Sequence, residues 1–265
     1  MKIFVVNLDQ RKDRLDFMVT QFIKLGLEYE RISATNGKQV FNESKLFNRY
    51  RFFLENRQYL VPGELGCAQS HINIWHRIIE EDIDYAVVLE DDVFIRPELK
   101  QVFEDINLIS NFDYLKIDDC HLHQYEMISG NETLNHDITN YKGSLYKKHI
   151  GKLFSAYECD PVPYGTGGYI ISKQGAKQFI KASKRMYYAV DLLPRYAAGK
   201  IRQGFLSHAI VIPMDVSDSD IGDRSKGIKL KFFERLIWVF HKTFNKRRLR
   251  QFDLTIMYKS RKEDK

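Results

Sequence analysis

The sequence predicts an α/β fold in which a mixed, mostly parallel β-sheet is flanked by helices. Short apolar runs rich in β-branched and aromatic residues, such as residues 3–8 and 85–89, alternate with stretches of helical periodicity, such as residues 11–26 and 64–80. This alternation is typical of parallel strands joined by helical crossovers. Polar residues directly follow both apolar runs, and open sheets of this class bind ligands at the carboxyl ends of their strands.

The first third of the chain supplies the elements in order. Residues 3–8 are almost uniformly apolar, which indicates a buried strand. Residues 11–26 carry apolar side chains at helical spacing and end at Gly26, a residue favoured just beyond helix ends. A strand over 29–33 and a turn at Asn36-Gly37 follow.

The rest of the chain continues the pattern. Helix-like residues 43–60 precede Pro62-Gly63-Glu64, which opens the helix over 64–80, and residues 85–89 form a second buried strand. Further on, the pattern predicts helices over 97–109 and 173–184 and strands over 113–117, 168–172 and 209–213. Residues 121–160 are weakly patterned and predict a long loop excursion.

Composition excludes several classes of protein. The chain has 265 residues with 44% apolar and 29% charged side chains, which argues against disordered, collagen-like and coiled-coil proteins. Cys67, Cys120 and Cys159 are widely spaced, which argues against a disulfide scaffold or zinc finger and fits a reducing compartment. No apolar run approaches the roughly 20 residues that span a bilayer, and the first residues are too soon polar for a signal peptide.

The charge is unevenly distributed. Residues 224–265 hold 14 Lys/Arg and 4 Asp/Glu, a net +10, whereas the remaining 223 residues hold 27 and 31, a net −4. We therefore divide the chain into an acidic main domain, residues 1–223, and a basic amphipathic tail, residues 224–265. Such asymmetry indicates an anionic partner at one end.

Three consecutive acids, Glu90, Asp91 and Asp92, end the second buried strand. Clustered carboxylates repel one another, and Mg²⁺ or Mn²⁺ offsets the repulsion because these ions prefer oxygen ligands. Along an extended strand, Glu90 and Asp92 face one side and Asp91 the other. The alternative is a solvated acidic turn, but the position at the end of a buried strand favours a metal–diphosphate site.

A cluster of polar residues follows the first strand. Arg11 and Arg14 share a helical face, where they could clamp a diphosphate or stack on a base, although a solvated first turn fits equally well. There is no glycine-rich phosphate loop or dinucleotide fingerprint here. Ser70 and His71 are not a catalytic dyad because neighbours on a helix point apart, and by itself His71 is read as a buried, hydrogen-bonded histidine and Cys67 as a core residue.

Three later features are candidates for the site. The glycines of the segment 163–169 allow close approach of a ligand such as a sugar ring, or simply form a loop. Asp191, an acid among apolar residues, is a candidate general base or a helix N-cap. His208 could complete a metal shell.

The tail combines an apolar helical stripe with basic residues. The stripe is Phe233, Leu236, Ile237, Phe240 and Phe244. A basic amphipathic helix with aromatic residues is typical of an interfacial membrane anchor. A helix packed on the domain with a basic outer face, and nucleic-acid binding, are the alternatives.

Six stretches, in order, resemble glycosyltransferase family 25, the bacterial lipooligosaccharide galactosyltransferases with relatives among collagen galactosyltransferases. They are VVNLDQRKDR (5–14), ISATNG (32–37), PGELGCAQSH (62–71), VVLEDDVFI (87–95), GTGGYIISKQGAKQFI (165–180) and VDLLP (190–194). The resemblance covers about residues 3–195, and residues 121–160 and the tail match poorly.

The resemblance implies a Rossmann-like GT-A fold and inverting transfer from a nucleotide sugar. It implies a metal site (Mn²⁺ or Mg²⁺) at Asp92 and Glu90, with His208 as a further candidate, and Asp191 as the catalytic base. The donor-binding residues that it implies, together with the glycine loop, are Asn7, Arg11, Arg14, Ala34, Thr35, Asn36, Gly37, Ser70, His71, Asp91, Gly167 and Gly168. Relatives often have Asp-Gly where this chain has Asn36-Gly37, so a charged contact is not expected there.

The expected function is metal-dependent transfer of a hexose, galactose from UDP-galactose, to a lipid-linked lipooligosaccharide or lipopolysaccharide acceptor. The expected location is the cytoplasmic face of the bacterial inner membrane, with the tail on anionic lipid and no nucleic acid as partner. A metal-dependent nucleotidyltransferase or phosphoesterase would use the same acids, but it usually needs a second acidic set or a phosphate loop. A membrane- or nucleic-acid-binding protein that acts through the tail is the non-enzymatic alternative.

Overall fold

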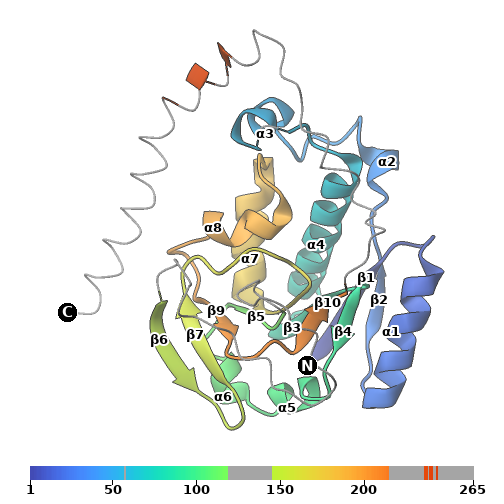
Figure 1. The fold of residues 1–265 in the computed structure, drawn as a ribbon, viewed down its shortest axis with the longest axis vertical. Coiled ribbons are helices and arrows are strands. Elements are labelled where there is room, and N and C mark those ends of the chain that lie inside the picture. The colour runs from blue at the N-terminus through green and yellow to red at the C-terminus, as the bar shows by residue number, and fades with distance from the viewer. Residues whose placement is uncertain (57, 119–144, 215–235, 238, 241–242, 244–265) are drawn as a thin grey trace.

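An eight-stranded mixed sheet forms the centre of the computed structural model, which describes residues 1–56, 58–118, 145–214 and five tail positions, 236, 237, 239, 240 and 243. In spatial order the strands are β2 (Glu30–Ser33), β1 (Lys2–Asn7), β3 (Tyr85–Glu90), β8 (Gly168–Ser172), β5 (Tyr114–Lys116), β9 (Gln203–Leu206), β7 (Ser155–Cys159) and β6 (Leu145–Ile150). A small antiparallel pair, β4 (Val93–Ile95) with β10 (Val211–Pro213), lies beside it (Figure 1).

Helices cover both faces of the sheet and enclose two apolar cores (Figure 1). One face carries α3 (Arg49–Asn56), α4 (Pro62–Glu80), α7 (Lys173–Ala182) and α8 (Leu193–Tyr196). The other face carries α1 (Lys12–Leu25), α5 (Leu99–Phe103) and α6 (Ile106–Ile109). Three short turns of helix, α2 (Gly37–Val40), η2 (Ser183–Arg185) and η3 (Val190–Leu192), complete the architecture.

The sequence explains this two-sided burial. Alternate residues of β1 enter opposite cores, with Phe4 on the α4 side and Ile3 and Val5 on the α1 side. An apolar residue at every position is therefore required, as expected for a strand buried on both faces. The predicted stop at Gly26 is confirmed: Gly26 takes the left-handed conformation that caps α1.

The predicted α/β, Rossmann-like GT-A class is confirmed, but the sheet is not mostly parallel. Among the described strands it has three parallel pairings (β1–β2, β1–β3 and β5–β9) and four antiparallel ones (β3–β8, β5–β8, β6–β7 and β7–β9). The reason is that β8 runs opposite to both of its neighbours, and a hairpin closes the far edge.

The expected loop over residues 121–160 is also wrong for its last part. Residues 145–159 form the β6–β7 hairpin, and residues 119–144 lie outside the described part. Polar side chains obscured both strands, of which β6 forms the edge of the sheet and β7 lies between β6 and β9. The single predicted helix over 97–109 is two short helices, α5 and α6, and the strands β4 and β9 were not predicted.

The tail is described at too few positions to test its predicted boundary. Positions 236, 237, 239 and 240 are helical, in line with the predicted amphipathic helix. The other predicted stripe residues, Phe233 and Phe244, lie outside the described residues. Within the described part of the chain, no helix is long and apolar enough to cross a membrane.

Candidate functional site

The three consecutive acids lie at the carboxyl end of β3, where the parallel strand β1 also ends. The β1–β3 register pairs Val6 with Glu90, which brings Asn7 beside Asp91. The divergence of the acids that strand alternation predicts is found in part. Glu90 and Asp92 face the open space in front of the sheet, whereas Asp91 is 7% exposed and turns back toward β1 and α1.

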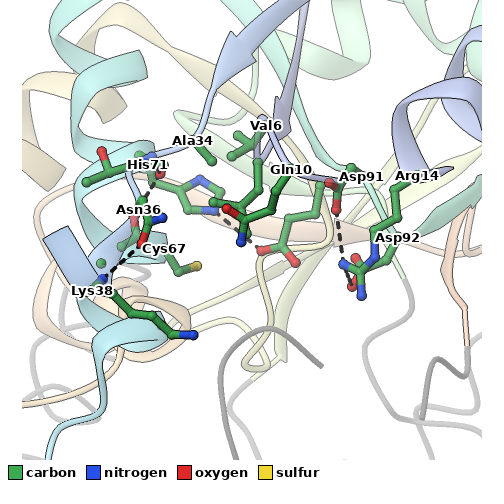
Figure 2. Close-up of a pocket in the computed structure, with 17 residues that line it drawn as sticks. Val6, Gln10, Arg14, Ala34, Asn36, Lys38, Cys67, His71, Asp91 and Asp92 are labelled. Atoms are coloured by element: carbon green, nitrogen blue, oxygen red, sulfur yellow. Dashed lines mark hydrogen bonds and ion pairs between the residues drawn. The ribbon is translucent and has the colours of Figure 1, made fainter. Parts of the chain in front are cut away.

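Asn7 and Arg14 hold Asp91 in place. Asn7 is buried, and its Nδ2 donates to Asp91 Oδ2 over 2.7 Å. Arg14 Nη1 lies 3.2 Å from Asp91 Oδ1 and 3.0 Å from Asp92 Oδ2, so a single guanidinium pairs with two acids (Figure 2). Asn7 in turn accepts a 2.9 Å bond from Arg31 Nε. The structure therefore gives Asn7 and Asp91 positioning contacts, and Arg14 both these contacts and a place on the cavity wall.

Burial and mutual repulsion govern the ionisation of the acids. Burial raises the pKa of Asp92 to about 6, and the charge of Glu90 adds to the shift while Arg14 opposes it. Burial also raises the pKa of Asp91 against the hydrogen bonds of Asn7 and Arg14. Burial acts against ionisation of Glu90 as well, but the hydrogen bonds from His71 and Thr166 prevail and lower its pKa.

A first cavity opens beside these acids, between the ends of β1 and β3, the turn before α2, and α4 (Figure 2). It contains most of the predicted donor-binding residues. They are Arg14, Ala34, Thr35, Asn36, Gly37, Ser70, His71 and Asp91, together with Glu90 and Asp92. Arg11 does not line it, and its Nη2 pairs with Asp13 Oδ2 at 2.9 Å.

Close packing fixes the 34–37 turn against α4. Ser70 Oγ accepts a 2.8 Å hydrogen bond from the Thr35 amide and donates to the Gly66 carbonyl. Gly37 and Gly66 allow direct backbone contact, since a Cβ on Gly66 would lie 2.5 Å from the Thr35 carbonyl oxygen. Asn36 caps α2 through its side chain, which accepts from the Lys38 amide. Ser70 is thus a structural link between the turn and the helix.

His71 belongs to a chain of hydrogen bonds that reaches Glu90. Its ring is fully buried, with Nδ1 2.8 Å from Tyr169 Oη and Nε2 3.4 Å from Glu90 Oε1. Trp75 Nε1 donates to the same Tyr169 oxygen, and Thr166 Oγ1 donates to Glu90 Oε1 over 2.6 Å. Burial raises the pKa of Tyr169 well above its usual value, so its hydroxyl stays protonated.

A second cavity lies on the other side of Glu90 and Asp92. Its lining includes Asp191 from η3, the 164–167 loop and Asp118. Gly167, a predicted donor-binding residue, lines this cavity and not the first, and its carbonyl accepts from the Glu90 amide. The half-exposed ring of Tyr164 lies at the cavity edge.

A buried ion pair supports the second cavity. Lys116 Nζ lies 2.9 Å from Asp118 Oδ1, and both side chains are almost completely buried. The same ammonium donates to the carbonyls of Tyr164 and Gly165, at 3.0 and 2.8 Å. Lys116 therefore fixes the backbone of Tyr164 and Gly165, which line this cavity.

The two cavities share one wall, made of Cys67, Glu90 and Asp92, and both are open to solvent. Cys67 was expected in the core, but it is only partly buried and borders both cavities. Two concave spaces that meet at a pair of carboxylates can hold two reactants with their reacting groups at the wall.

Besides Asn7 and Arg11, two further predicted residues line neither cavity. His208 lines neither cavity: its Nδ1 is 2.8 Å from Ser207 Oγ and its ring packs on Phe154. Burial and then the charge of Arg96 lower the pKa of His208. Gly168 lies in β8 against Val211, where a Cβ would come within 2.9 Å of the valine side chain. Its packing explains the glycine without any ligand.

The carboxylates at the shared wall fit a hard divalent cation. Glu90 and Asp92 both face the cavities, and the pKa of Asp92 is raised first by burial and then by the charge of Glu90, a repulsion that a cation would relieve. Asn7 and Arg14 engage both oxygens of Asp91, whereas Arg14 contacts Asp92 through Oδ2 alone, so we assign the oxygen ligands for Mg²⁺ or Mn²⁺ to Glu90 and Asp92.

Sequence reasoning missed several residues of the site. Lys116 and Asp118 end a short strand with no distinctive motif, and only the fold brings them under the 164–167 loop. Tyr164 and Thr166 stand inside the glycine-rich segment that the sequence did single out, so their proximity to glycines was the signal that could have found them.

The comparisons of this chain with a family model and with known proteins agree on one family. Residues 1–194 match the model of "Glycosyltransferase family 25 (LPS biosynthesis protein)". Human procollagen galactosyltransferase 2 is 29% identical over 189 residues, which cover 69% of this chain and 28% of that protein. A glycosyltransferase 25 family member of Anopheles gambiae is 27% identical over 190 residues, 68% of this chain and 28% of the mosquito protein. The match thus spans little more than a quarter of the length of these relatives.

Among solved structures, A197 from STIV aligns with 84% of this chain and all of its own chain, at a TM-score of 0.38 and 16% identity. A likeness at this level carries no argument about function.

Proposed function

Because the chain belongs to glycosyltransferase family 25, we propose that it transfers galactose from UDP-galactose, with inversion, to a hydroxyl group of a lipooligosaccharide or lipopolysaccharide glycan. The observation that carries this proposal is the pair of cavities that meet at Glu90 and Asp92. One cavity takes the nucleotide sugar and the other the acceptor, so that the anomeric carbon and the acceptor hydroxyl meet at the shared wall.

The first cavity is the donor side in this proposal. It lies at the carboxyl ends of β1 and β3, where sheets of this class bind nucleotides, and contains the turn at residues 34–37. Arg14 provides positive charge near the diphosphate while it fixes Asp91 and Asp92. Mn²⁺ or Mg²⁺ on Glu90 and Asp92 would supply neutralisation of the leaving diphosphate.

The second cavity is the acceptor side. Asp191 lines it and is the candidate base, since an acceptor hydroxyl in this cavity must lose its proton as it attacks. The acceptor oxygen forms a bond to the anomeric carbon, the bond from that carbon to the diphosphate oxygen breaks, and UDP leaves with the electron pair. The aromatic face of Tyr164 offers an apolar platform for the acceptor sugar.

The choice of a lipopolysaccharide acceptor follows the description of the family model, which names lipopolysaccharide biosynthesis. Of the two relatives described above, the human protein is named a procollagen galactosyltransferase, and this name supports galactose as the transferred sugar. Galactose and its epimers differ in the orientation of a single hydroxyl group, so the donor must be identified by experiment.

We also propose that the tail holds the enzyme on the cytoplasmic face of the bacterial inner membrane. Its described positions expose Leu236, Ile237 and Phe240 by 41%, 44% and 64%, and Ile237 borders a surface cavity with Tyr50 of α3. The net charge of +10 over residues 224–265 would add attraction to anionic lipid. Unchanged binding to anionic liposomes after removal of residues 228–250 would contradict this placement.

The central test is a donor screen with matched variants. Purified enzyme is incubated with a panel of UDP-sugars, Mn²⁺ and truncated core oligosaccharides, and UDP release and product linkage are measured. We expect galactose transfer that falls at least about 100-fold in both Asp191→Asn and Asp92→Asn. Asp191→Asn should still bind UDP-galactose with wild-type affinity because Asp191 lines only the second cavity.

The exposed acid Asp13, which pairs with Arg11 away from the cavities, provides the matched control, and Asp13→Asn should keep full turnover. Near wild-type transfer in both Asp92→Asn and Asp191→Asn would overturn the assignment. Turnover of nucleoside triphosphates in place of UDP-sugars would favour the nucleotidyltransferase alternative.

A further inference from the structure

The wall between the two cavities contains a second set of candidate metal-ligand atoms, which differ in chemistry from the carboxylates of Glu90 and Asp92. Cys67 Sγ, one ring nitrogen of His71 and a carboxylate oxygen of Glu90 all lie within 4.8 Å of one another. Cys67 and His71 are one helical turn apart on α4, so the helix presents both toward the end of β3. Figure 2 shows the Cys67 sulfur and the His71 ring at the same cavity.

The spacing of these atoms suits a small tetrahedral ion. His71 Nε2 and Glu90 Oε1 are 3.4 Å apart, long for a hydrogen bond. With metal–ligand bonds of about 2.0–2.1 Å, the nitrogen and oxygen ligands of a tetrahedral ion lie about 3.4 Å apart. A small inward shift of the thiolate would complete three corners of the tetrahedron and leave the fourth facing the cavities.

Neighbouring residues already orient two of the three ligands. When an ion replaces the hydrogen bond between His71 Nε2 and Glu90, the ring proton belongs on Nδ1, where Tyr169 Oη, 2.8 Å away, can accept its hydrogen bond. Thr166 Oγ1 donates to Glu90 Oε1 and limits its rotation. His71 is fully buried, whereas the Glu90 side chain is 28% exposed, so an ion can enter from the cavities.

We propose that Cys67, His71 and Glu90 form a binding site for a thiophilic divalent cation of the Zn²⁺ class, with an open fourth position. A thiolate and an imidazole select Zn²⁺ over Mg²⁺ or Mn²⁺, which prefer all-oxygen sites such as Glu90 with Asp92. Since Glu90 belongs to both sets, an ion at this site competes with one held by Asp92. The site does not depend on hexose transfer, and its test needs no turnover.

Cobalt titration of the full chain tests the site directly. Co²⁺ in a tetrahedral thiolate site gives a near-ultraviolet charge-transfer band and strong visible bands, and Zn²⁺ should displace it. We expect saturation at one equivalent in the wild type. Cys67→Ser should lose the charge-transfer band and bind Zn²⁺ at least about 100-fold more weakly, and Tyr169→Phe should weaken Zn²⁺ binding about 10- to 100-fold.

Two control variants separate this site from others. Asp92→Asn removes the hard ligand and should keep the band, and Cys159→Ala removes a buried thiol away from the cavities and should also keep it. Circular dichroism of each metal-free variant checks that it is folded. A wild-type protein without the band, or a folded Cys67→Ser that retains it, would overturn the proposal.

Discussion

The two cavities are built in different ways although they share one wall. The first is assembled from residues 6–14, 34–38, 63–71 and 90–92, all in the first third of the chain and at the ends of parallel strands. The second draws on residues from 64 to 214 and is completed by loops around an antiparallel strand. Both cavities depend on long-range contacts, but segments with recognisable motifs build the proposed donor side, whereas segments with weaker motifs build much of the proposed acceptor side.

The largest effect confined to the acceptor side should come from removal of the buried ammonium group of Lys116, which supports the second cavity. Lys116→Met leaves Asp118 buried without its partner and removes the donor to the Tyr164 and Gly165 carbonyls. We expect a loss of about 3 kcal/mol in the free energy of unfolding, measured by urea denaturation. The KM for acceptor should rise while the KM for UDP-galactose stays within about twofold.

The double variant Lys116→Met/Asp118→Asn supplies the control. Because it removes both charges, it should recover part of the lost stability. Burial raises the pKa of Asp118 even beside Lys116, so the lone acid in the single variant takes up a proton more readily than usual. A single variant as stable as the wild type would show that the ion pair does not support this side of the molecule.

On the donor side, we expect the largest effect from a substitution at Gly66, where the backbone of α4 contacts the backbone of Thr35. Gly66→Ala puts a methyl group 2.5 Å from the Thr35 carbonyl oxygen, so the 34–37 turn must move away from α4. We expect a loss of about 1–3 kcal/mol in stability and a higher KM for UDP-galactose. Ala68→Gly, on the same helix but within the apolar core, serves as the control and should cost stability without a change in donor KM.

A smaller effect should follow from loss of the Ser70 hydroxyl. Ser70→Ala leaves the Thr35 amide without its 2.8 Å acceptor but adds no bulk. We expect about 1 kcal/mol lower stability and a donor KM raised less than in Gly66→Ala, measured in the same assays. A donor KM unchanged in both variants would contradict the assignment of the first cavity to the nucleotide sugar.

The smallest expected effect is a pH dependence of the free energy of unfolding. It comes from Asp160, which lies in the half of the sheet that carries the acceptor side. Burial raises the pKa of Asp160 to about 6, and the charge of Glu158 adds to this against the hydrogen bond from the Gly199 amide. The folded protein therefore holds a proton that the unfolded chain releases near pH 4. The resulting stabilisation is complete below about pH 4 and is lost as the pH rises through about 6.

Asp160→Asn should remove this contribution. We expect the wild type to lose about 1 kcal/mol more than the variant between pH 4 and pH 7, since partial exposure of the carboxyl reduces the full effect of the shift. Urea denaturation of both proteins at the two pH values gives the difference. An equal change in both would show that Asp160 titrates normally.

Sequence patterns predicted many of the residues that line the first cavity, for a physical reason. The first strand and the strand that ends in Glu90 are neighbours in the sheet, so residues that follow them directly had to meet. The expected difference between the acids is found only in part: Glu90 and Asp92 border both cavities, whereas Asp91 borders the first alone and bonds to Asn7. The sequence shows glycines at 37 and 66, but it did not predict that the backbone around Gly37 packs directly on the backbone around Gly66.

The acceptor side resisted prediction because segments with weaker motifs build much of it. The strand over 168–172 was predicted, but its antiparallel direction in the sheet has no local signature, and the polar β6–β7 hairpin was taken for a loop. The placement of Asp191 at the second cavity depends on η3 packing near α4, far away in sequence. His208 was a plausible ligand by residue type alone, and the fold places it beside Ser207 and Phe154.

The sequence by itself determined the α/β class, the buried strands, the family, and the acids at the end of β3, because these depend on local pattern and residue order. Only the tertiary structure decided that Arg14 and Asn7 hold Asp91, that Lys116 supports the 164–167 loop, and that Cys67 and His71 meet Glu90 at the shared wall. Those arrangements join residues from different elements, and only the closed packing of the folded chain fixes the distances between them.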